Sequence, residues 1–371
     1  MVLFVLTFVA IYGAMHALLF WGLHPLLKGH PALPTLSWIW MGLMVVAPIL
    51  VRLCDRAGFE ALARGLAWVG YSWMGFCFIG FCLFALAGVW ELLIRLAGLT
   101  VDSATRLSIH GPQLALLGVA LMLGAGLYGL FEARDLMVER VRIATGHLPS
   151  GMDRLVIAQV SDLHLGLLHR DDELGPIVTR LLELKPDLVV ATGDIVDAQI
   201  SHLDGLSALW RQIDPPLGKY AVTGNHEFYA GLEQAIAFLE KSGFTVLRNR
   251  AAEIAPGILL LGVDDPAGRR PVPELQLLDS LDHSKLRILL KHRPKVADRP
   301  GLFDLQLSGH THRGQIFPFN LLTGMAYPLQ DGLYPLSGGG YLYTSRGTGS
   351  WGPPMRIGAR PELTLIELVR K

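Results

Sequence analysis

The sequence predicts an α/β protein in two parts, a membrane-embedded helical region followed by a layered domain of strands and helices. The chain has 371 residues, which is more than one ordinary domain requires. It carries 32 basic and 32 acidic side chains, but only 16 of these charges lie in residues 1–150. From about residue 137 the pattern changes to short apolar runs that alternate with helical segments. We therefore divide the chain into 1–136 and 137–371.

The composition excludes several classes of protein. A hydrophobic fraction of 51% excludes a disordered chain. The formal net charge of +0 provides no long-range attraction for polyanions, so we expect no specific nucleic-acid partner. The three cysteines, Cys54, Cys77 and Cys82, are odd in number and follow no spacing pattern. They predict neither a disulfide framework nor a zinc-cysteine site.

Four uncharged stretches in the first part are long enough to cross a bilayer. Residues 1–27 carry no formal charge, and uncharged stretches of 23, 26 and 25 residues follow. A helix needs about 20 apolar residues to span the hydrocarbon core. We predict four transmembrane helices, at 2–22, 35–53, 67–91 and 111–132, and the lipid bilayer as a partner. Pro48 is expected to kink the second helix, and the segment near Pro31 and Pro34 to be loop.

The distribution of Lys and Arg predicts the orientation. With four spans, one side of the membrane holds six of these residues near the spans and the other side holds three. Because cytoplasmic loops are enriched in Lys and Arg, this favours a multi-pass protein with a cytoplasmic C-terminal domain. Glu91 and Arg95, four residues apart at a span end, are interpreted as an interfacial ion pair.

The second part alternates between strand-like and helix-like segments. Residues 154–160 are a β-rich apolar run, and 171–184 carry the apolar spacing of an amphipathic helix, with Asp171 or Asp172 as its cap. Further strands are expected near 187–194, 219–225, 244–248, 258–263, 287–292, 304–308, 340–346 and 361–369, with a helix at about 229–242. This alternation predicts a layered α/β fold.

Polar side chains that can bind metals or transfer protons follow the ends of these strands. They are Asp162, His164, Asp194, Asp197, Asn225, His226, His292, His310 and His312. The intervals from Asp162 to Asp194 and from Asp194 to Asn225 each match one strand-helix-strand step of about 30 residues. The side chains are therefore expected to meet on one edge of the sheet. Taken singly, Asp162 and Asp194 could equally be helix caps, and Asn225 and His226 an ordinary turn.

Imidazole, carboxylate and amide ligands suit divalent ions such as Mn, Fe or Zn. Seven of these nine side chains acting as ligands would exceed the needs of one tetrahedral ion but would suit two ions that share a bridging ligand. Such a pair can hold hydroxide and neutralise a phosphoryl group. Gly193, Gly224 and Gly309 are expected to allow the tight turns that bring short ligands inward.

Five ordered blocks resemble the calcineurin-like metallophosphoesterases, in their bacterial membrane-associated branch. The blocks are DLH at 162–164, GD-x-x-D at 193–197, GNHE at 224–227, KHRP around His292 and GHTH at 309–312. The phrases LSGHTHRGQIFP and SRGTGS…ARPELTLIEL extend the resemblance nearly to the C-terminus. It implies a four-layer α/β/β/α domain, with two sheets between helical layers.

The resemblance also implies a role for each residue. Asp162, His164 and His312 would bind a first metal ion, Asn225, His292 and His310 a second, and Asp194 would bridge the two. His226 would assist the leaving group without binding metal.

Two arginines are candidate phosphate-binding residues. Arg313 stands where this branch often has glycine, so it either strains the turn or reaches a substrate phosphate. Arg346, in TSRGTGS, could bind phosphate through its guanidinium group.

The remaining interpretations concern residues outside the motifs. Residues 317–356 form either a lipid-facing groove or an irregular loop layer. Asp264 and Asp265 are expected to form a turn. His169, His202 and His283 are expected at the surface.

The sequence thus predicts a membrane-anchored, metal-dependent phosphohydrolase, with two metal ions acting on a phosphoester or pyrophosphate bond of a lipid-linked substrate. Two alternatives remain at this stage. One is a phosphodiesterase for soluble nucleotides that the spans merely tether, and the other is a non-catalytic membrane sensor that binds phosphorylated ligands.

Overall fold

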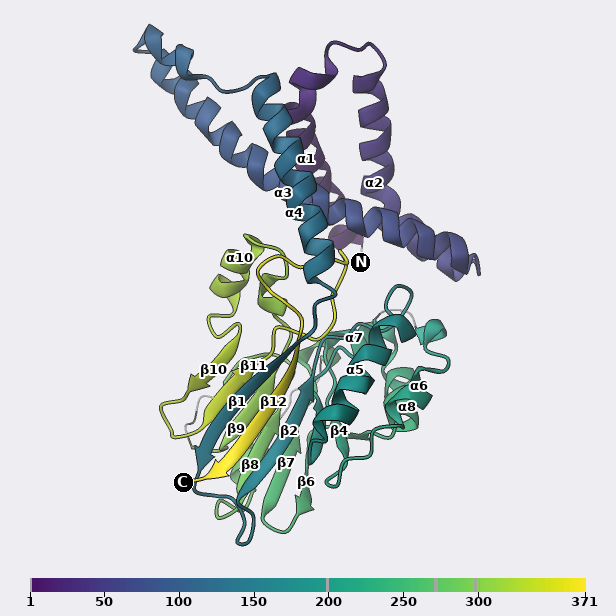
Figure 1. Cartoon of the computed structure of the whole chain (residues 1–371), viewed down its shortest axis with the longest axis vertical. Coiled ribbons are helices and arrows are strands. Elements are labelled where there is room, and N and C mark those ends of the chain that lie inside the picture. The colour runs from purple at the N-terminus through teal and green to yellow at the C-terminus, as the bar shows by residue number, and fades with distance from the viewer. Residues whose placement is uncertain (1, 198–199, 270–272, 297–298, 300) are drawn as a thin grey trace. The chain divides into compact units, whose positions relative to one another are not determined.

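The computed structural model describes residues 2–197, 200–269, 273–296, 299 and 301–371. The chain forms two compact units (Figure 1). The first unit comprises residues 1–131 with 352–355, and the second comprises residues 132–351 with 356–371.

The first unit contains four long helices: α1 (Val2–Leu27), α2 (Leu33–Arg56), α3 (Glu60–Gly98) and α4 (Pro112–Glu132), with a short 3-10 helix η1 (Asp102–Leu107) before α4. All four are long and apolar enough to cross a membrane. The helices extend beyond most of the predicted spans, because sequence hydropathy marks the apolar centre of a helix and not its ends. The 39 residues of α3 would measure about 58 Å, about twice the hydrocarbon thickness.

Three local expectations in this unit can be compared with the structure. Pro48 lies inside α2, whereas Pro34 lies in its first turn and not in a loop. A proline fits there because the first backbone N–H groups of a helix have no partner within the helix. The carboxylate of Glu91, expected to pair with Arg95, instead accepts hydrogen bonds from the Ser108 hydroxyl and from the backbone N–H groups of Ile109 and His110.

The second unit is built on two six-stranded sheets. The first sheet has the order β1-β12-β2-β3-β4-β5 and the second β10-β11-β9-β8-β7-β6. The strands are β1 (Met137–Thr145), β2 (Arg154–Val160), β3 (Leu188–Ala191), β4 (Lys219–Ala221), β5 (Thr245–Val246), β6 (Arg250–Ala255), β7 (Ile258–Gly262), β8 (Leu286–Leu290), β9 (Leu305–Ser308), β10 (Gly332–Pro335), β11 (Tyr341–Thr344) and β12 (Glu362–Arg370). The helices are α5 (Asp171–Leu184), α6 (Leu206–Trp210), α7 (Asn225–Ala230), α8 (Leu232–Lys241), α9 (Glu274–Asp279) and α10 (Phe319–Ala326), with short turns η2 (Ile200–His202), η3 (Pro266–Gly268) and η4 (His312–Gly314).

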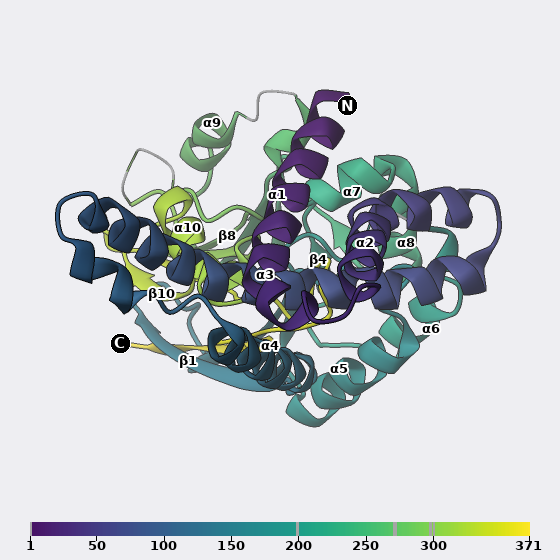
Figure 2. The ribbon, with the colours of Figure 1, turned by 90° about the horizontal axis from the view of Figure 1, so that it is seen from above.

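The buried side chains confirm the four-layer arrangement. Successive residues of a strand face opposite sides, so Ile157 of β2 joins a core with Ile288 of β8 between the two sheets. Its neighbour Ala158 packs with Leu174 on the other face, in a core that also includes side chains of α6 and α8. A third core joins the second sheet to α9. Figure 2 shows α5, α6 and α8 grouped on one side and α9 on the other.

The junction between the fourth helix and the first sheet is short. Helix α4 ends at Glu132 and β1 begins at Met137. Met137 pairs with Glu362 of β12, and Thr364 pairs with Gln159 near the end of β2. The start of β1 therefore lies at the same edge of the first sheet as the end of β2. We call this edge the ligand edge, because the predicted ligand Asp162 comes just after the end of β2 there.

The sequence predictions for this unit agree in most elements. The strand at 154–160 and the helix at 171–184 have the predicted bounds. The cap of α5 differs from the prediction, because the N-cap residue is Arg170. Asp171 and Asp172 lie in the first turn, where their negative charges interact favourably with the positive end of the helix dipole. Within 317–356, the structure has β11, which matches the strand expected near 340–346, and also α10 and β10, which were not predicted because their sequence is rich in Gly and Pro.

Candidate metal centre

Every predicted ligand follows a strand closely in sequence, at the ligand edge or at the matching edge of the second sheet. Asp162 and His164 follow β2, and Asp194 follows β3. Asn225 begins α7 after β4, His292 follows β8, and His310 and His312 follow β9. Because the carboxyl ends of parallel strands meet at one edge of a sheet, these segments converge.

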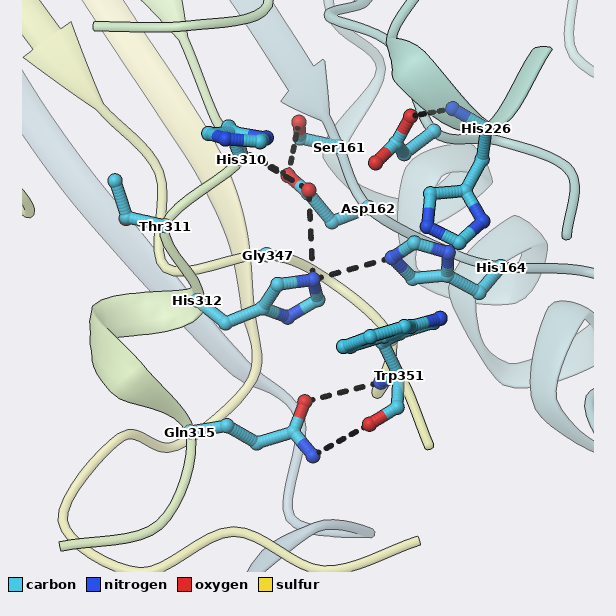
Figure 3. Close-up of polar contacts among 12 residues, drawn as sticks. Ser161, Asp162, His164, His226, His310, Thr311, His312, Gln315, Gly347 and Trp351 are labelled. Carbon is cyan, nitrogen blue, oxygen red and sulfur yellow. Dashed lines mark hydrogen bonds and ion pairs between the residues drawn. The ribbon is translucent and has the colours of Figure 1, made fainter. Parts of the chain in front are cut away.

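The first group of side chains contains Asp162, His164 and His312 (Figure 3). The Nε2 atoms of His164 and His312 face one another at 3.1 Å. The His312 Nε2 atom lies 3.5 Å from the Asp162 carboxylate. Asp162 and His164 are fully or almost fully buried.

The second group contains Asp194, His292 and His310. The His292 Nε2 atom lies 3.2 Å from Asp194 Oδ2 and 3.2 Å from His310 Nδ1. Asp194 also forms a third group with His164 and His226, in which the potential ligand atoms lie within 4.8 Å of one another. Asp194 thus stands between the first and second groups.

These residues fit divalent metal ions. Two imidazole nitrogens bound to one ion at about 2.1 Å stand about 3.0–3.4 Å apart for ligand angles of about 90–110°. The facing nitrogen pairs at 3.1 and 3.2 Å match this spacing. The buried side-chain oxygen of Asn225 has no hydrogen-bond partner within the described structure. A buried acceptor without a donor is unfavourable, and a cation beside it would satisfy it.

The electrostatics of the buried groups also favour a cation. Burial lowers the pKa of His292, but the neighbouring Asp194 carboxylate outweighs it and raises the pKa to about 10. The positive charge and the hydrogen bond of His292 in turn keep the pKa of the Asp194 carboxyl well below its ordinary value, although burial would raise it. Burial, with the charge on His292, lowers the pKa of His310 to about 3. Asp194 therefore requires a positive charge beside it, which a proton on His292 or a metal ion supplies.

The ligand loops hold strained backbone conformations. Asp162, His164, Asp194, His310 and His312 all have positive φ, between 47° and 75°. Such conformations cost about 1–3 kcal/mol each outside glycine and persist where the surrounding structure enforces them. Their concentration at five predicted ligands indicates a functional site.

Close approach explains two of the predicted glycines. A Cβ atom on Gly309 would lie 2.0 Å from the Ser161 hydroxyl and 2.3 Å from the Asp162 carboxylate. A Cβ atom on Gly224 would lie 2.2 Å from the Asp194 carboxylate. Both positions require glycine so that the ligand loops can approach one another.

His226 lies beside both groups and is oriented by a carboxylate. Its Nδ1 atom is 2.9 Å from Asp197 Oδ1, and its backbone N–H donates to Asp194 Oδ1 at 2.8 Å. Burial lowers its pKa, but Asp197 and Asp194 outweigh burial and raise it. Its ring is 5.6 Å from that of Trp351, which is 54% exposed. Figure 3 shows Trp351 close to His164 and His226.

The two candidate arginines already have carboxylate partners. Arg313 has φ 49° and ψ 34°, the left-handed conformation that favours glycine, and its Nε atom lies 3.4 Å from Asp331. Arg346 pairs with Glu139 at 3.0 Å and with Glu362 at 2.6 Å. These pairs favour a structural role for Arg346.

Sequence reasoning assigned no role to two buried residues that hold the ligand loops. The Glu227 carboxylate accepts backbone hydrogen bonds from Asp194 at 2.9 Å, Ile195 at 2.8 Å and Gly224 at 2.7 Å. The Arg356 guanidinium, fully buried, donates to the carbonyl oxygens of Arg346 and Ala359 and lies 3.0 Å from His312 Nδ1. A lone charge in an apolar, Gly-rich segment was the only available signal for Arg356.

We expect Glu227→Gln to destabilise the domain by about 1–3 kcal/mol or more, because an amide N–H₂ would face backbone donors that would then lack an acceptor. Urea unfolding measures the change. Glu183→Gln is the matched control, since Glu183 forms an exposed pair with Arg180, and such pairs contribute little. Equal stability of the two variants would contradict the assigned role of Glu227.

Three residues outside the motifs, His169, His283 and Asp265, can be compared with their predicted positions. His169, expected at the surface, is 5% exposed and lies 2.7 Å from Glu173, because the loop before α5 folds inward. His283 is exposed, as expected. Asp265 caps the turn η3 through the backbone N–H of Ala267 and pairs with Arg293, which confirms the turn interpretation.

A layered α/β domain with clustered Asp and His side chains at its strand ends defines the class of metal-dependent phosphoesterases. Comparison with known proteins agrees. Residues 155–314 match the family model described as calcineurin-like phosphoesterase. The chain is 40% identical over 262 residues to an uncharacterized metallophosphoesterase of Aquifex aeolicus, a match that covers 68% of this chain and 98% of that protein.

Two further relatives extend this comparison. The metallophosphoesterase YkuE of Bacillus subtilis, which is uncharacterized, is 36% identical, with 68% of this chain and 93% of that protein covered. A transmembrane protein with a metallophosphoesterase domain from Danio rerio is 35% identical, with 70% of this chain and 63% of that protein covered. The chain belongs to the calcineurin-like phosphoesterase family and is a membrane-associated phosphoester hydrolase.

Proposed function

We propose that this chain is a multi-pass membrane phosphohydrolase that cleaves a phosphoester or pyrophosphate bond in a lipid-linked substrate. The carrying observation is the short junction at the ligand edge. Four residues separate the end of α4 from β1, and they span at most roughly 15–20 Å. β1 lies two strands from β2, about 10 Å away. A phosphate at headgroup level is therefore within reach of the ligand edge.

In this proposal the seven ligand side chains hold two divalent ions. Asp162, His164 and His312 would hold one ion, and Asn225, His292 and His310 the other. Asp194, between the two groups, would hold both. When bound, the ions would neutralise the phosphoryl oxygens and activate a water molecule for in-line attack.

The protein's own contribution to proton transfer is His226. Its Nδ1–H donates to Asp197, which fixes the ring orientation and leaves Nε2 facing away from that carboxylate. From there Nε2 would give a proton to the leaving oxygen. His226 is next in sequence to the proposed ligand Asn225, and this keeps it beside the scissile bond.

The second candidate function is a tethered phosphodiesterase for soluble nucleotides. Tyr229 and Trp351 favour it, because both rings pack edge-on to His226 and are 61% and 54% exposed. Exposed aromatic rings stack well on nucleobases. The Lys and Arg distribution supports a cytoplasmic domain for either candidate.

The test compares two substrates with the full-length protein in lipid nanodiscs. One is a lipid-linked pyrophosphate or phosphodiester, and the other is its water-soluble headgroup analogue. We expect metal-dependent hydrolysis of both substrates, with kcat/KM about tenfold or more higher for the lipid-linked form. The lipid would be bound equally in the ground state and the transition state, and such binding raises kcat/KM. Equal or higher kcat/KM for the soluble analogue would favour the nucleotide candidate, and absence of metal-dependent hydrolysis would contradict both.

A further inference from the structure

Helix α10 presents an apolar outer face. Phe317, just before the helix, is 58% exposed, and Leu321, Leu322 and Met325 are 62%, 59% and 80% exposed. Leu321 and Leu322 lie four and three residues before Met325, so the three share one side of the helix. We call these four residues the α10 patch. Large side chains exposed together on one face mark an interaction surface.

The inner face of the same helix is attached to the metal centre. A Cβ atom on Gly314, in the turn that carries His312, would lie 2.4 Å from the backbone of Asn320, so α10 packs directly on that turn. At the other end of α10, the Tyr327 hydroxyl lies 3.1 Å from His310 Nε2. Helix α10, which carries most of the α10 patch, therefore contacts the segments of two proposed ligands, His310 and His312.

Helix α10 also lies at the end of the domain where the chain leaves the membrane-spanning segments. It connects the loop after β9 to the start of β10, beside the loops that converge at the ligand edge. The start of β1 belongs to the same edge. In Figure 1, β1 and β12 run away from the end of the sheets at which α10 lies.

Cationic side chains lie near both ends of α10, and Arg313, although it pairs with Asp331, stays partly exposed. Arg313 precedes α10 and has a side chain that is 39% exposed. The exposed Lys295 places its ammonium group 5.9 Å from the ring centroid of Tyr327. Helices that lie in a membrane interface combine an apolar face with cations at its border, which meet anionic headgroups.

We propose that α10 is an interfacial membrane helix, whose patch enters the boundary between headgroups and acyl chains of the bilayer that holds α1–α4. The occupant is lipid because the junction between α4 and β1 holds the ligand edge close to the bilayer. This contact would keep the metal centre at headgroup level. It does not depend on the substrate, since a soluble nucleotide would be cleaved at the same place.

The test measures lipid contact and not activity. Cys54, Cys77 and Cys82 are replaced by alanine in the full-length protein, and Met325→Cys is labelled with a bimane fluorophore. The protein is reconstituted into phosphatidylcholine/phosphatidylglycerol nanodiscs with and without a lipid that carries a nitroxide quencher near its headgroup. We expect a loss of about half or more of the emission, because an interfacial helix lies about 5–10 Å into the boundary region.

Leu182→Cys provides the matched control. Leu182 is 43% exposed in the last turn of α5, which leads to the start of β3 and so to the opposite end of the sheet. We expect no quenching there, and we expect Leu322→Glu to reduce quenching at Met325→Cys while Leu322→Met does not. Equal emission with and without the quencher at position 325 would overturn the proposal. Bimane emission that instead depends on protein concentration in detergent would assign the patch to a second copy and would also overturn it.

Discussion

Replacing Asp194 with asparagine is expected to lower kcat by at least about 10³-fold and to release bound metal. Loss of a residue that only orients a ligand already costs about 10–100-fold in metal affinity, and Asp194 is proposed as a direct ligand to both ions. The amide would also remove the negative charge that lies 3.2 Å from His292. Metal content by elemental analysis and turnover of a soluble phosphodiester measure the two effects.

The control for this variant is Asp171→Asn, at an exposed position in the first turn of α5. It should keep both metal content and turnover. If Asp194→Asn retained two ions per chain with normal turnover, the bridging role would be wrong. Loss of turnover with full metal content would instead assign Asp194 to substrate binding.

Replacing His226 with glutamine is expected to lower kcat by about 10²–10⁴-fold while metal content stays unchanged, because His226 is proposed to donate a proton and to bind no metal. The reduction should depend on the leaving group. An alkyl phosphodiester needs a proton on its leaving oxygen, whereas p-nitrophenolate leaves readily without one. Turnover of the two substrates by the same variant measures the difference.

His30→Gln serves as the control, since His30 is exposed in the loop before α2. Equal reductions for the two leaving groups would contradict proton donation and would indicate that His226 acts by stabilising charge on the phosphoryl group. Loss of metal in His226→Gln would make it a ligand, in line with its place in the third group of potential ligand atoms.

The helices and strands were largely predictable because their signals are local, whereas the four-layer arrangement was predicted from the resemblance to a known family. Apolar runs marked the four long helices and β2, and the helical period of the apolar residues marked α5. The proposed ligands were predictable because Asp, His and Asn recur after strands at the interval of a strand-helix-strand step. The structure brings six of these residues into the groups described above, and Asn225 contributes a buried oxygen without a partner.

The rest depends on contacts that sequence spacing does not encode. Glu227 has the same residue type as many exposed acids, and only the fold brings the backbone of Asp194 and Ile195 to it. Arg356 acts through carbonyl groups of a loop without regular structure. The sequence left open whether Arg313 takes a strained positive φ or binds a substrate phosphate, because the residue type alone does not determine the backbone conformation. The structure has Arg313 with positive φ.

The pairing of β1 with β12 affects how the catalytic part can be separated from its anchor. The family match begins at residue 155, after β1, yet β1 covers β12 along nine paired residues. A fragment that begins at residue 155 would leave the apolar strand β12 as an open edge, and open edges pair with other molecules and aggregate. With β1 present, the outermost strand instead carries Glu139, Arg140 and Arg142, and charges on an edge strand discourage such pairing. The strand that follows the four candidate membrane helices thus also protects the sheet of the phosphoesterase domain from self-association.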